Sequence, residues 1–472
     1  MSAKKSNSRF QEFWDDFRRE KSGLIGLGIL AVAILVVIFE PLFLPYKDVN
    51  EGNWRNISYW EDNSSAAPPA WTNIFTSKKS AVSTTFNSPE VSTEEDPNYG
   101  LVTTYSFKYN YKYDLPPLDL IIRAKASGMS LFLMELERPD GNIVPVGEQF
   151  FEGLNEDQIR FSMDTDAASN AYEFARQFAS EEALANSDST TIRPTFVAFS
   201  ETGSDMLSAR VPLKGTYTLR IRVPSFITDD SNNVLEDLRL IVTGRVSGIL
   251  GTDTYKRDIF TGIVAGLKWA LFIGLATSVV SVLFGVMYGI ISAYFGGLVD
   301  TSMQFVYQIF AGIPVMPLLI VLAAIFKPSI WIIMGVMIVF SWTGSVMTVR
   351  SMAFQIKEET FVEAAKALGS GKWRIIFKHI APILLPYSFA SMALAVPGTI
   401  VYEASLSLLG LGDPTIITWG QILHDAQNSG ATLNGLWWWI VPPGLFIALM
   451  GATFAFLGFA MDKILNPKLR TR

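Results

Sequence analysis

The sequence predicts an all-α polytopic membrane protein with six transmembrane helices, into which a mostly-β soluble domain is inserted. Three observations support this fold class. Hydrophobic residues make up 49% of the 472 residues and charged residues only 17%, which is less charge than a soluble protein of this size carries. The apolar residues gather in runs long enough to cross a bilayer. One internal stretch has instead the alternating pattern and turn sequences typical of β-strands.

The first part of the chain predicts a cytoplasmic N-terminus followed by a membrane anchor. Residues 1–21 are basic and predict an amphipathic helix that lies along the cytoplasmic membrane interface. Residues 22–45 are nearly all apolar and predict the first transmembrane helix, uncleaved because no small-residue cleavage site follows. The basic residues before this helix place the N-terminus inside. The apolar stripe of the amphipathic helix consists of Phe10, Phe13, Trp14 and Phe17.

Residues 46–247 predict an extracytoplasmic, β-rich insertion, most simply a sandwich. Segments 118–126, 130–137 and 217–223 alternate as strands do, and segment 173–185 predicts a short helix. The insertion carries 18 Lys and Arg against 29 Asp and Glu, a net charge of −11, whereas the rest of the chain has 20 against 15, a net charge of +5. This division suits a protein that faces two compartments.

Residues 248–472 predict a five-helix core. The spans are expected near 263–295, 301–326, 330–349, 384–409 and 436–460. An inside N-terminus then places the loop of residues 350–382 and the C-terminus in the cytoplasm. Both segments are rich in Lys and Arg, whereas the outside loop of about 411–435 has none, which is the positive-inside pattern. Three tryptophans that begin the last span fit either an interfacial belt or packing against neighbouring helices.

Several prolines and one carboxylate within the spans are candidates for translocation or gating. Pro314 and Pro317 are predicted to break the third span, Pro397 the fifth, and the Pro442-Pro443 pair the sixth. Broken helices are tolerated where they line a cavity or bury each other. Glu403 is a candidate because an intramembrane carboxylate is costly to bury. The alternative is that Glu403 faces the outer interface or hydrogen-bonds a neighbouring helix. The gating candidates are Pro314, Pro397 and Glu403.

Composition argues against enzymatic chemistry. The chain has no Cys and only two His, so disulfides and thiol nucleophiles are excluded and a histidine-rich metal site is disfavoured. The Gly369-Ser370-Gly371-Lys372 sequence lacks the flanking Gly and Ser or Thr of a phosphate-binding loop. The sequence therefore predicts no catalytic residues, no metal, no cofactor and no nucleic-acid partner, and any ATP hydrolysis must reside on a separate subunit.

The loop of residues 350–382 is the segment most informative about function. Two apolar sets at helical spacing predict two short amphipathic helices, with Gly369-Ser370-Gly371 as a hinge between them. Such a unit suits a groove in a partner protein, although a helix resting on lipid has the same pattern. The first apolar set is Phe361, Ala364, Ala365 and Leu368, and the second is Trp373, Ile376, Phe377 and Ile380.

This loop resembles the EAA loop of ATP-binding-cassette importer permeases. The similar residues are Glu363-Ala364-Ala365, then Gly369, then Ile380-Ala381-Pro382. The wider chain is similar to the second-permease type of the dipeptide, oligopeptide and nickel branch, strongly over residues 248–472 and weakly over residues 9–45. Departures are Lys256 for a usual Gly, Phe305 for Arg, Gln308 for Asp and Asn466 for Asp. Further similar motifs lie at 250–258, 403–412, 419–420 and 466–470.

The resemblance implies a type I importer permease fold in the cytoplasmic (inner) membrane. It implies that the loop docks on an ATPase subunit, through Phe361, Glu363, Ala364, Ala365, Leu368 and Gly369. The implied partners are ATP-binding ATPase subunits, a homologous permease in a heterodimer, an extracytoplasmic substrate-binding protein and membrane lipid. Peptides are the implied cargo, with nickel chelates or sugars left open.

The resemblance says nothing about residues 46–247, which ordinary members lack. The insertion could dock the binding protein, gate the outer mouth or bind cell-wall material. One alternative function is a membrane-anchored receptor or sensor whose β domain is the working part, but a sensor has no need of an EAA-like loop. A proton-driven secondary transporter would show an inverted repeat and more buried carboxylates, and neither is evident.

Overall fold

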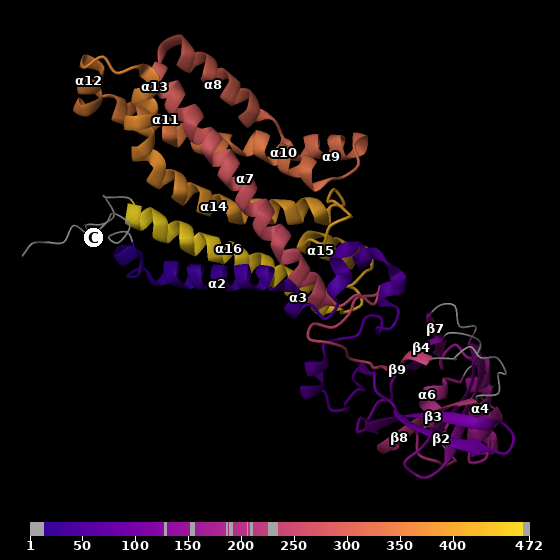
Figure 1. Cartoon of the computed structure of the whole chain (residues 1–472). Coiled ribbons are helices and arrows are strands. Elements are labelled where there is room, and N and C mark those ends of the chain that lie inside the picture. The colour runs from indigo at the N-terminus through magenta and orange to yellow at the C-terminus, as the bar shows by residue number, and fades with distance from the viewer. Residues whose placement is uncertain are drawn as a thin grey trace, which may run out of the picture. The chain divides into compact units, whose positions relative to one another are not determined.

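The computed structural model describes residues 14–126, 130–151, 156–185, 187, 192–204, 206–207, 211–224 and 235–465. The chain divides into two compact units. Unit 1 comprises Met1–Arg55 and Thr261–Arg472, and unit 2 comprises Asn56–Phe260. Figure 1 shows long helices in unit 1, and strands with short helices in unit 2. Phe10, Phe13 and the motif at 466–470 lie outside the described residues.

Unit 1 is built from helices. Its first helices precede unit 2 in the chain, and the others follow it. The helices before unit 2 are α2 (Lys21–Ile38) and α3 (Glu40–Phe43), then the 3-10 turns η1 (Lys47–Glu51) and η2 (Asn53–Arg55). The later helices are α7 (Ile259–Phe295), α8 (Gly297–Gly312), α9 (Val315–Ile325), α10 (Ile330–Ser341), α11 (Thr343–Lys357), α12 (Thr360–Ala367), α13 (Lys372–Ile375), the π-helical turn η5 (Ile376–Ile380), α14 (Ala381–Leu408), α15 (Trp419–Asn428) and α16 (Trp437–Leu465).

Within the described residues, five helices are long and apolar enough to cross a membrane, and the bent pair α8–α9 would add a sixth. The two helices of that pair are bent by 67° relative to each other. The five are Lys21–Ile38, Ile259–Phe295, Ile330–Lys357, Lys372–Leu408 and Trp437–Ile464. Several membrane spans therefore lie in the segments that hydropathy predicts.

The predicted proline breaks are only partly correct. The chain leaves helical geometry at Pro314, which is the N-cap of α9. Pro397 lies inside the continuous helix α14, and Pro442 and Pro443 lie inside α16. A proline removes one backbone hydrogen bond, and neighbouring helices stabilise a membrane helix that contains it. These two helices pack directly on each other, since a Cβ on Gly458 would meet the Leu394 side chain at 2.6 Å.

Glycines on α7 set the spacing of the bundle. A Cβ at Gly285 would lie 2.2 Å from the Trp342 carbonyl oxygen, and one at Gly289 would lie 2.8 Å from the Val346 carbonyl oxygen. A Cβ at Gly274 would meet Val396 of α14 at 2.9 Å. Helix α7 therefore contacts the α10–α11 segment at one level and α14 at another, and small residues permit this close approach.

The first span lies beside the last, as Figure 1 shows for α2 and α16. A Cβ at Gly26 would lie 2.8 Å from the Thr453 carbonyl oxygen. The same pair of helices is joined by an ion pair of 2.8 Å between Lys463 and Glu20. Only 17% of the apolar window of α2 is buried, so most of its surface is left for lipid.

Helix α15 is a short amphipathic helix held against the spans. Its Trp419 indole N–H donates to the Ile263 carbonyl at 3.0 Å, and a Cβ at Gly420 would lie 2.7 Å from the Ala404 Cα of α14. The Arg55 guanidinium donates to Asp425 at 3.1 Å. The segment after α3 is thereby tied to α15.

Unit 2 contains two antiparallel sheets, in the orders β1-β9-β4-β7 and β2-β3-β8-β5-β6. The strands are β1 (Thr84–Phe86), β2 (Glu90–Asp96), β3 (Gly100–Tyr111), β4 (Asp119–Ala126), β5 (Ser130–Glu137), β6 (Ile143–Phe151), β7 (Glu156–Arg160), β8 (Gly215–Pro224) and β9 (Leu235–Thr243). The 3-10 turns η3 (Ile57–Trp60) and η4 (Ala70–Ile74) precede them. The three strands predicted from alternation correspond to β4, β5 and β8.

The helix predicted over 173–185 is wrong in its bounds. The structure has α4 (Thr165–Arg176), α5 (Glu181–Ala185) and α6 (Pro194–Ala198) instead. The Asp164 carboxylate begins α4 by accepting hydrogen bonds from the Asp166 and Ala167 amides at 2.8 and 2.9 Å. An Asp at this position is a recognised N-cap signal.

One buried cation organises the core of unit 2. The Arg138 side chain is fully buried and donates to the carbonyls of Ala198 and Ser200 at 3.2 and 2.7 Å. It also pairs with Asp140 at 2.9 Å and lies over the Phe174 ring, 5.0 Å from its centroid. Arg138 therefore joins a strand end to α4 and α6.

Candidate functional site

Helix α12 is anchored to the bundle by two of its residues. Val362 is fully buried and Ala365 nearly so. Both belong to one apolar cluster with residues of α7, α11 and α14, which includes Ile290, Val349 and Leu384. The short helix thus has a defined inner face that fixes its orientation on the spans.

A glycine ends α12 in a specific cap. Gly369 has φ +78°, a backbone conformation that favours glycine. The Gly369 amide donates to the Lys366 carbonyl and the Ser370 amide to the Ala365 carbonyl, both at 3.0 Å. These two bonds define a Schellman motif. Gly371 then begins α13 with an ordinary φ of −63°.

The outward face of this loop is apolar. Leu368 is 86% exposed, and Phe361, Trp373 and Phe377 are also among the exposed large hydrophobic residues. The Trp373 and Phe377 rings are stacked with centroids 6.0 Å apart. We call Phe361, Leu368, Trp373 and Phe377 the elbow face. An apolar patch of this kind marks an interaction surface.

The predicted amphipathic stripes differ in phase from the observed ones. Ala365 is buried, but Phe361, Ala364 and Leu368 are exposed. In the second stripe, Ile376 and Ile380 are buried whereas Trp373 and Phe377 are exposed. The second segment is also not a separate short helix, because Lys372–Leu408 is one continuous helical run. Three of the four residues of the first stripe and two of the four of the second are therefore exposed.

Charged groups surround the elbow face. Glu363 is exposed in the first turn of α12, where a carboxylate is favoured by the helix dipole. Within the described part of the chain, Glu363 forms no ion pair. Lys366, Arg374 and Lys378 are also exposed. An apolar centre with a charged rim has the composition of a protein interface.

We call residues 360–380, which carry the elbow face, the elbow. The elbow contacts the end of α7 directly. The Trp373 and Phe295 ring centroids lie 5.9 Å apart, and the Lys372 ammonium lies 5.6 Å from the centroid of the Phe295 ring. Phe295 is the last residue of α7, and Gly296 and Gly297 follow it with φ of +62° and +53°. The turn between α7 and α8 is therefore in contact with the elbow.

A bidentate ion pair ties α11 to α8. Arg350 donates to the two Asp300 carboxylate oxygens at 2.7 and 2.5 Å. The Ser292 hydroxyl also donates to Asp300, and the Arg350 guanidinium lies over Phe354 at 4.7 Å. Arg350 is one of the cations in the loop of residues 350–382, and the sequence pattern did not single out Asp300. An acidic residue in the first turn of an apolar span was the available signal.

The three gating candidates lie on two elements, α9 and α14. Glu403 is buried near the end of α14, where the Ser407 hydroxyl donates to it at 2.8 Å. Pro314 begins α9 at the 67° bend, and Pro397 lies in the middle of α14. The hydrogen bond from Ser407 is within one helix, whereas the side chain of Thr418, at the N-cap of α15, also hydrogen-bonds to Glu403.

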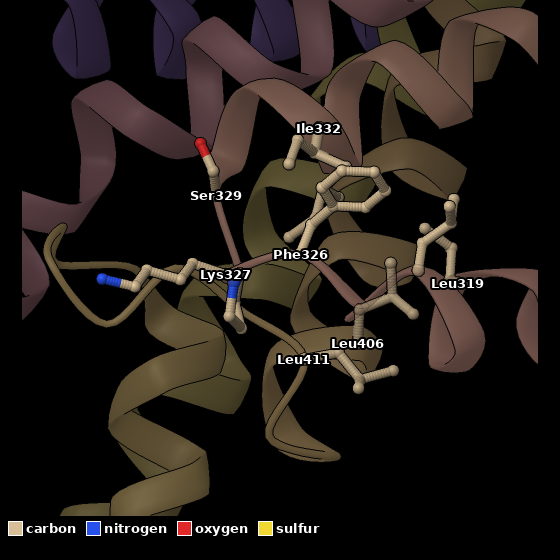
Figure 2. Close-up of a pocket in the computed structure, with 10 residues that line it drawn as sticks. Leu319, Phe326, Lys327, Ser329, Ile332, Leu406 and Leu411 are labelled. Carbon is tan, nitrogen blue, oxygen red and sulfur yellow. The ribbon is translucent and has the colours of Figure 1, made fainter. Parts of the chain in front are cut away.

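A small, mostly apolar cavity of about 20 Å³ lies between α9, α10 and α14. Figure 2 shows Phe326 beside Leu406 and Leu411, while the Lys327 ammonium points away from these apolar side chains. No group of three or more His, Cys, Asp and Glu that could hold a metal occurs among the residues the structure describes. The volume of the cavity leaves room for about one water molecule.

These features define a polytopic membrane protein whose helix bundle carries an exposed apolar elbow. Comparison with known proteins gives its family. The family described as "Binding-protein-dependent transport system inner membrane component" matches residues 285–471. The family described as "N-terminal TM domain of oligopeptide transport permease C" matches residues 8–69.

Two similar proteins come from Bacillus subtilis (strain 168). The dipeptide transport system permease protein DppC is 34% identical over 221 residues, covering 47% of this chain and 68% of that protein. The oligopeptide transport system permease protein OppC is 33% identical over 221 residues, covering 47% of this chain and 72% of that protein. A solved structure of the MetNI methionine ABC transporter in inward facing conformations has a TM-score of 0.32 at 19% identity, covering 45% of this chain and 97% of that chain.

The chain belongs to the family of binding-protein-dependent transport system inner membrane components. It is a permease subunit of an ATP-binding-cassette importer and a multi-pass membrane protein, not an enzyme. The family expected from the EAA-like loop is therefore confirmed.

Proposed function

We propose that this chain forms half of the translocation pathway of an ATP-driven peptide importer, and that residues 350–382 receive its ATPase. The observation that carries the proposal is the elbow face, an exposed apolar surface on a helix whose inner side and C-cap are fixed. The relatives named for dipeptide and oligopeptide transport support peptides as the cargo. The partners we infer are ATPase subunits, a homologous permease in a heterodimer and an external substrate-binding protein.

The contacts around the elbow support a mechanical role. A partner that moves α12 would also displace α13, because the two are adjacent in the chain. The Trp373 ring of α13 contacts Phe295 at the end of α7. The Arg350–Asp300 pair would carry the same displacement to α8. Glu363 would meet a basic group on the ATPase, because its carboxylate is exposed at the rim of the elbow face.

The proposed topology follows from the loop charges. The N-terminus, the loop of residues 350–382 and the C-terminus lie in the cytoplasm, and the β-rich insertion of residues 46–247 lies outside. Counting the bent α8–α9 pair as one span gives six. The acidic insertion is proposed to dock the binding protein, because its net charge of −11 can steer a basic partner surface.

We further propose that Pro314, Pro397 and Glu403 contribute to the pathway or its gate. The bend at Pro314 brings non-helical backbone into a span, which membrane proteins tolerate where that backbone lines a cavity or is buried in protein. Glu403 is an intramembrane carboxylate, a group that is retained at functional positions because its burial is costly.

Cysteine cross-linking tests the docking. The chain has no native Cys, so Leu368→Cys introduces a single reactive thiol on the elbow face. A short bifunctional reagent should link it to the ATPase subunit. Leu433→Cys, which is 92% exposed in the predicted outside loop, is the matched control and should give no such product. Cross-links from Leu368→Cys that reach only phospholipid would contradict the docking.

A functional variant complements this test. Glu363→Lys reverses the charge at the rim and should abolish ATP-coupled uptake while the chain still folds and inserts. Lys366→Ala, on the same helix and also exposed, controls for a change of charge without loss of the carboxylate. Normal uptake by Glu363→Lys would refute the assigned role. A receptor or sensor, the rival function, would be unaffected by either variant.

A further inference from the structure

A second exposed apolar surface lies in unit 2, on a loop that the importer function does not use. Ile74 is 73% and Phe75 80% exposed. Trp71 is also exposed, and its ring lies 6.2 Å from that of Phe75 in an edge-on contact. The Trp71 indole N–H donates to the carbonyl of Ile249 at 2.9 Å, and the Ile249 side chain is exposed too. We call these four residues the apolar tip.

The loop that carries the apolar tip is closed by specific hydrogen bonds. The Asn73 side chain donates to the Ser80 carbonyl and accepts from the Ser80 amide, both at 2.9 Å. The Lys79 ammonium donates to the carbonyls of Asn73 and Thr76 at 2.5 and 2.8 Å. These bonds close the loop between its two ends. Ile74 and Phe75 are therefore held outward by the fold of the loop.

One residue of the apolar tip lies shortly before a candidate membrane span in the chain. Ile249 is two positions before Gly251, and the Gly251 carbonyl accepts a hydrogen bond from the amide of Ile259 at 3.0 Å. Ile259 is the first residue of α7, a helix long and apolar enough to cross a membrane. Ile249 therefore lies ten residues before the first residue of a helix that is long and apolar enough to cross a membrane.

The composition of the loop indicates which partner it contacts. Trp and Phe are enriched at membrane–water interfaces, and an interfacial segment combines such residues with Lys. Lys78 is exposed directly after the apolar tip, in the position to meet an anionic headgroup. Tethering by α7 keeps the local lipid concentration high, so even a weak contact would be occupied.

We propose that residues 71–79, together with Ile249, rest in the headgroup region of the bilayer and hold unit 2 against an anionic lipid surface. This inference rests on the proposed function only in assigning the tip to the outer leaflet. A protein that covers the tip is the main alternative, and the experiment below separates the two.

The absence of native Cys makes single-site labelling direct. Phe75→Cys would carry an environment-sensitive nitrobenzoxadiazole dye in the full chain, reconstituted in nanodiscs of phosphatidylcholine and phosphatidylglycerol. Val91→Cys on β2, whose native side chain is 59% exposed, is the matched control in the same unit. Iodide in the water and doxyl-labelled lipid serve as the two quenchers.

The dye at position 75 should be several-fold less quenched by iodide than the dye at position 91, and only the former should be quenched by doxyl lipid. Adding Lys78→Glu should reduce its protection in the anionic discs. Equal iodide quenching at the two positions would overturn the proposal. Protection from iodide without doxyl quenching would show that a protein covers the tip and would also overturn it. ATP-driven uptake, measured in sealed proteoliposomes of the same lipids, tests the transport function separately.

Discussion

Replacing Gly369 by Ala isolates the conformational requirement at the end of α12. The structure gives this residue a φ of +78°, and a Cβ added there meets nothing within 4 Å. The substitution therefore adds no clash, and its cost comes only from forcing an L-residue into left-handed geometry. That cost is about 1–2 kcal/mol. It corresponds to about a 5- to 30-fold shift toward the open form of the cap.

Hydrogen exchange across the elbow measures this shift. The amides of residues 369 and 370 are both bonded in the closed cap, so local opening should accelerate their exchange by the same factor. Gly369→Asn should lie between Gly and Ala, because Asn tolerates left-handed geometry. Gly369→Pro should be the most severe, since it fixes φ near −65° and removes the donor to Lys366. ATP-coupled uptake should fall in the same order.

Gly371 provides the control for this series. It lies two residues further on, also has nothing within 4 Å of an added Cβ, but has a φ of −63°, which Ala adopts freely. Gly371→Ala should therefore leave exchange and uptake unchanged. If Ala at position 369 behaved like Ala at position 371, the cap would not be the constraint that orders the elbow.

Three further substitutions test other parts of the structure. Gly285→Leu should prevent recovery of folded protein in size-exclusion chromatography, because a Cβ at Gly285 would lie 2.2 Å from a backbone oxygen. The control variant Gly335→Leu should be recovered normally, because a Cβ at Gly335 meets nothing within 4 Å. Arg138→Met should lower the stability of unit 2 by roughly 3 kcal/mol, since buried carbonyls lose their donors, and a smaller loss in thermal unfolding would contradict this. Asp300→Arg should uncouple ATP hydrolysis from uptake, and combining it with Arg350→Asp should restore part of the coupling; no rescue would argue against the ion pair as the link.

The spans were predictable because an apolar run of about 20 residues is typical of a transmembrane helix. The end of α12 was predictable for a similar reason, since the glycines after residue 368 leave few ways to continue a helix. The phase of α12 was not predictable. Whether Val362 or Phe361 faces inward depends on the surface of α7 and α14 beneath it, and both residues satisfy an amphipathic pattern.

Long-range polar contacts could not be predicted from the sequence, because they too depend on how the helices pack. Asp300 and Arg350 lie on different helices, and nothing local in either segment indicates the other. Only the tight packing of α7 on α11, set by Gly285 and Gly289, brings the two helices into reach. By contrast, the start of α4 at Asp164 had a readable N-cap signal, which the helix predicted over 173–185 did not use.

The continuity of the helix after the elbow has a mechanical consequence. Helix α14 has 28 residues, so at 1.5 Å per residue it is about 42 Å long. If the helix moved as a rigid rod, a tilt of about 5° at the elbow would displace its far end, near Glu403, by about 4 Å. Pro386 and Pro397 both lie between the elbow and Glu403, and each removes one stabilising hydrogen bond, so α14 bends most readily at these two positions. The packing of α16 against the residues around Pro397 therefore decides how much of a displacement at the elbow reaches the buried carboxylate.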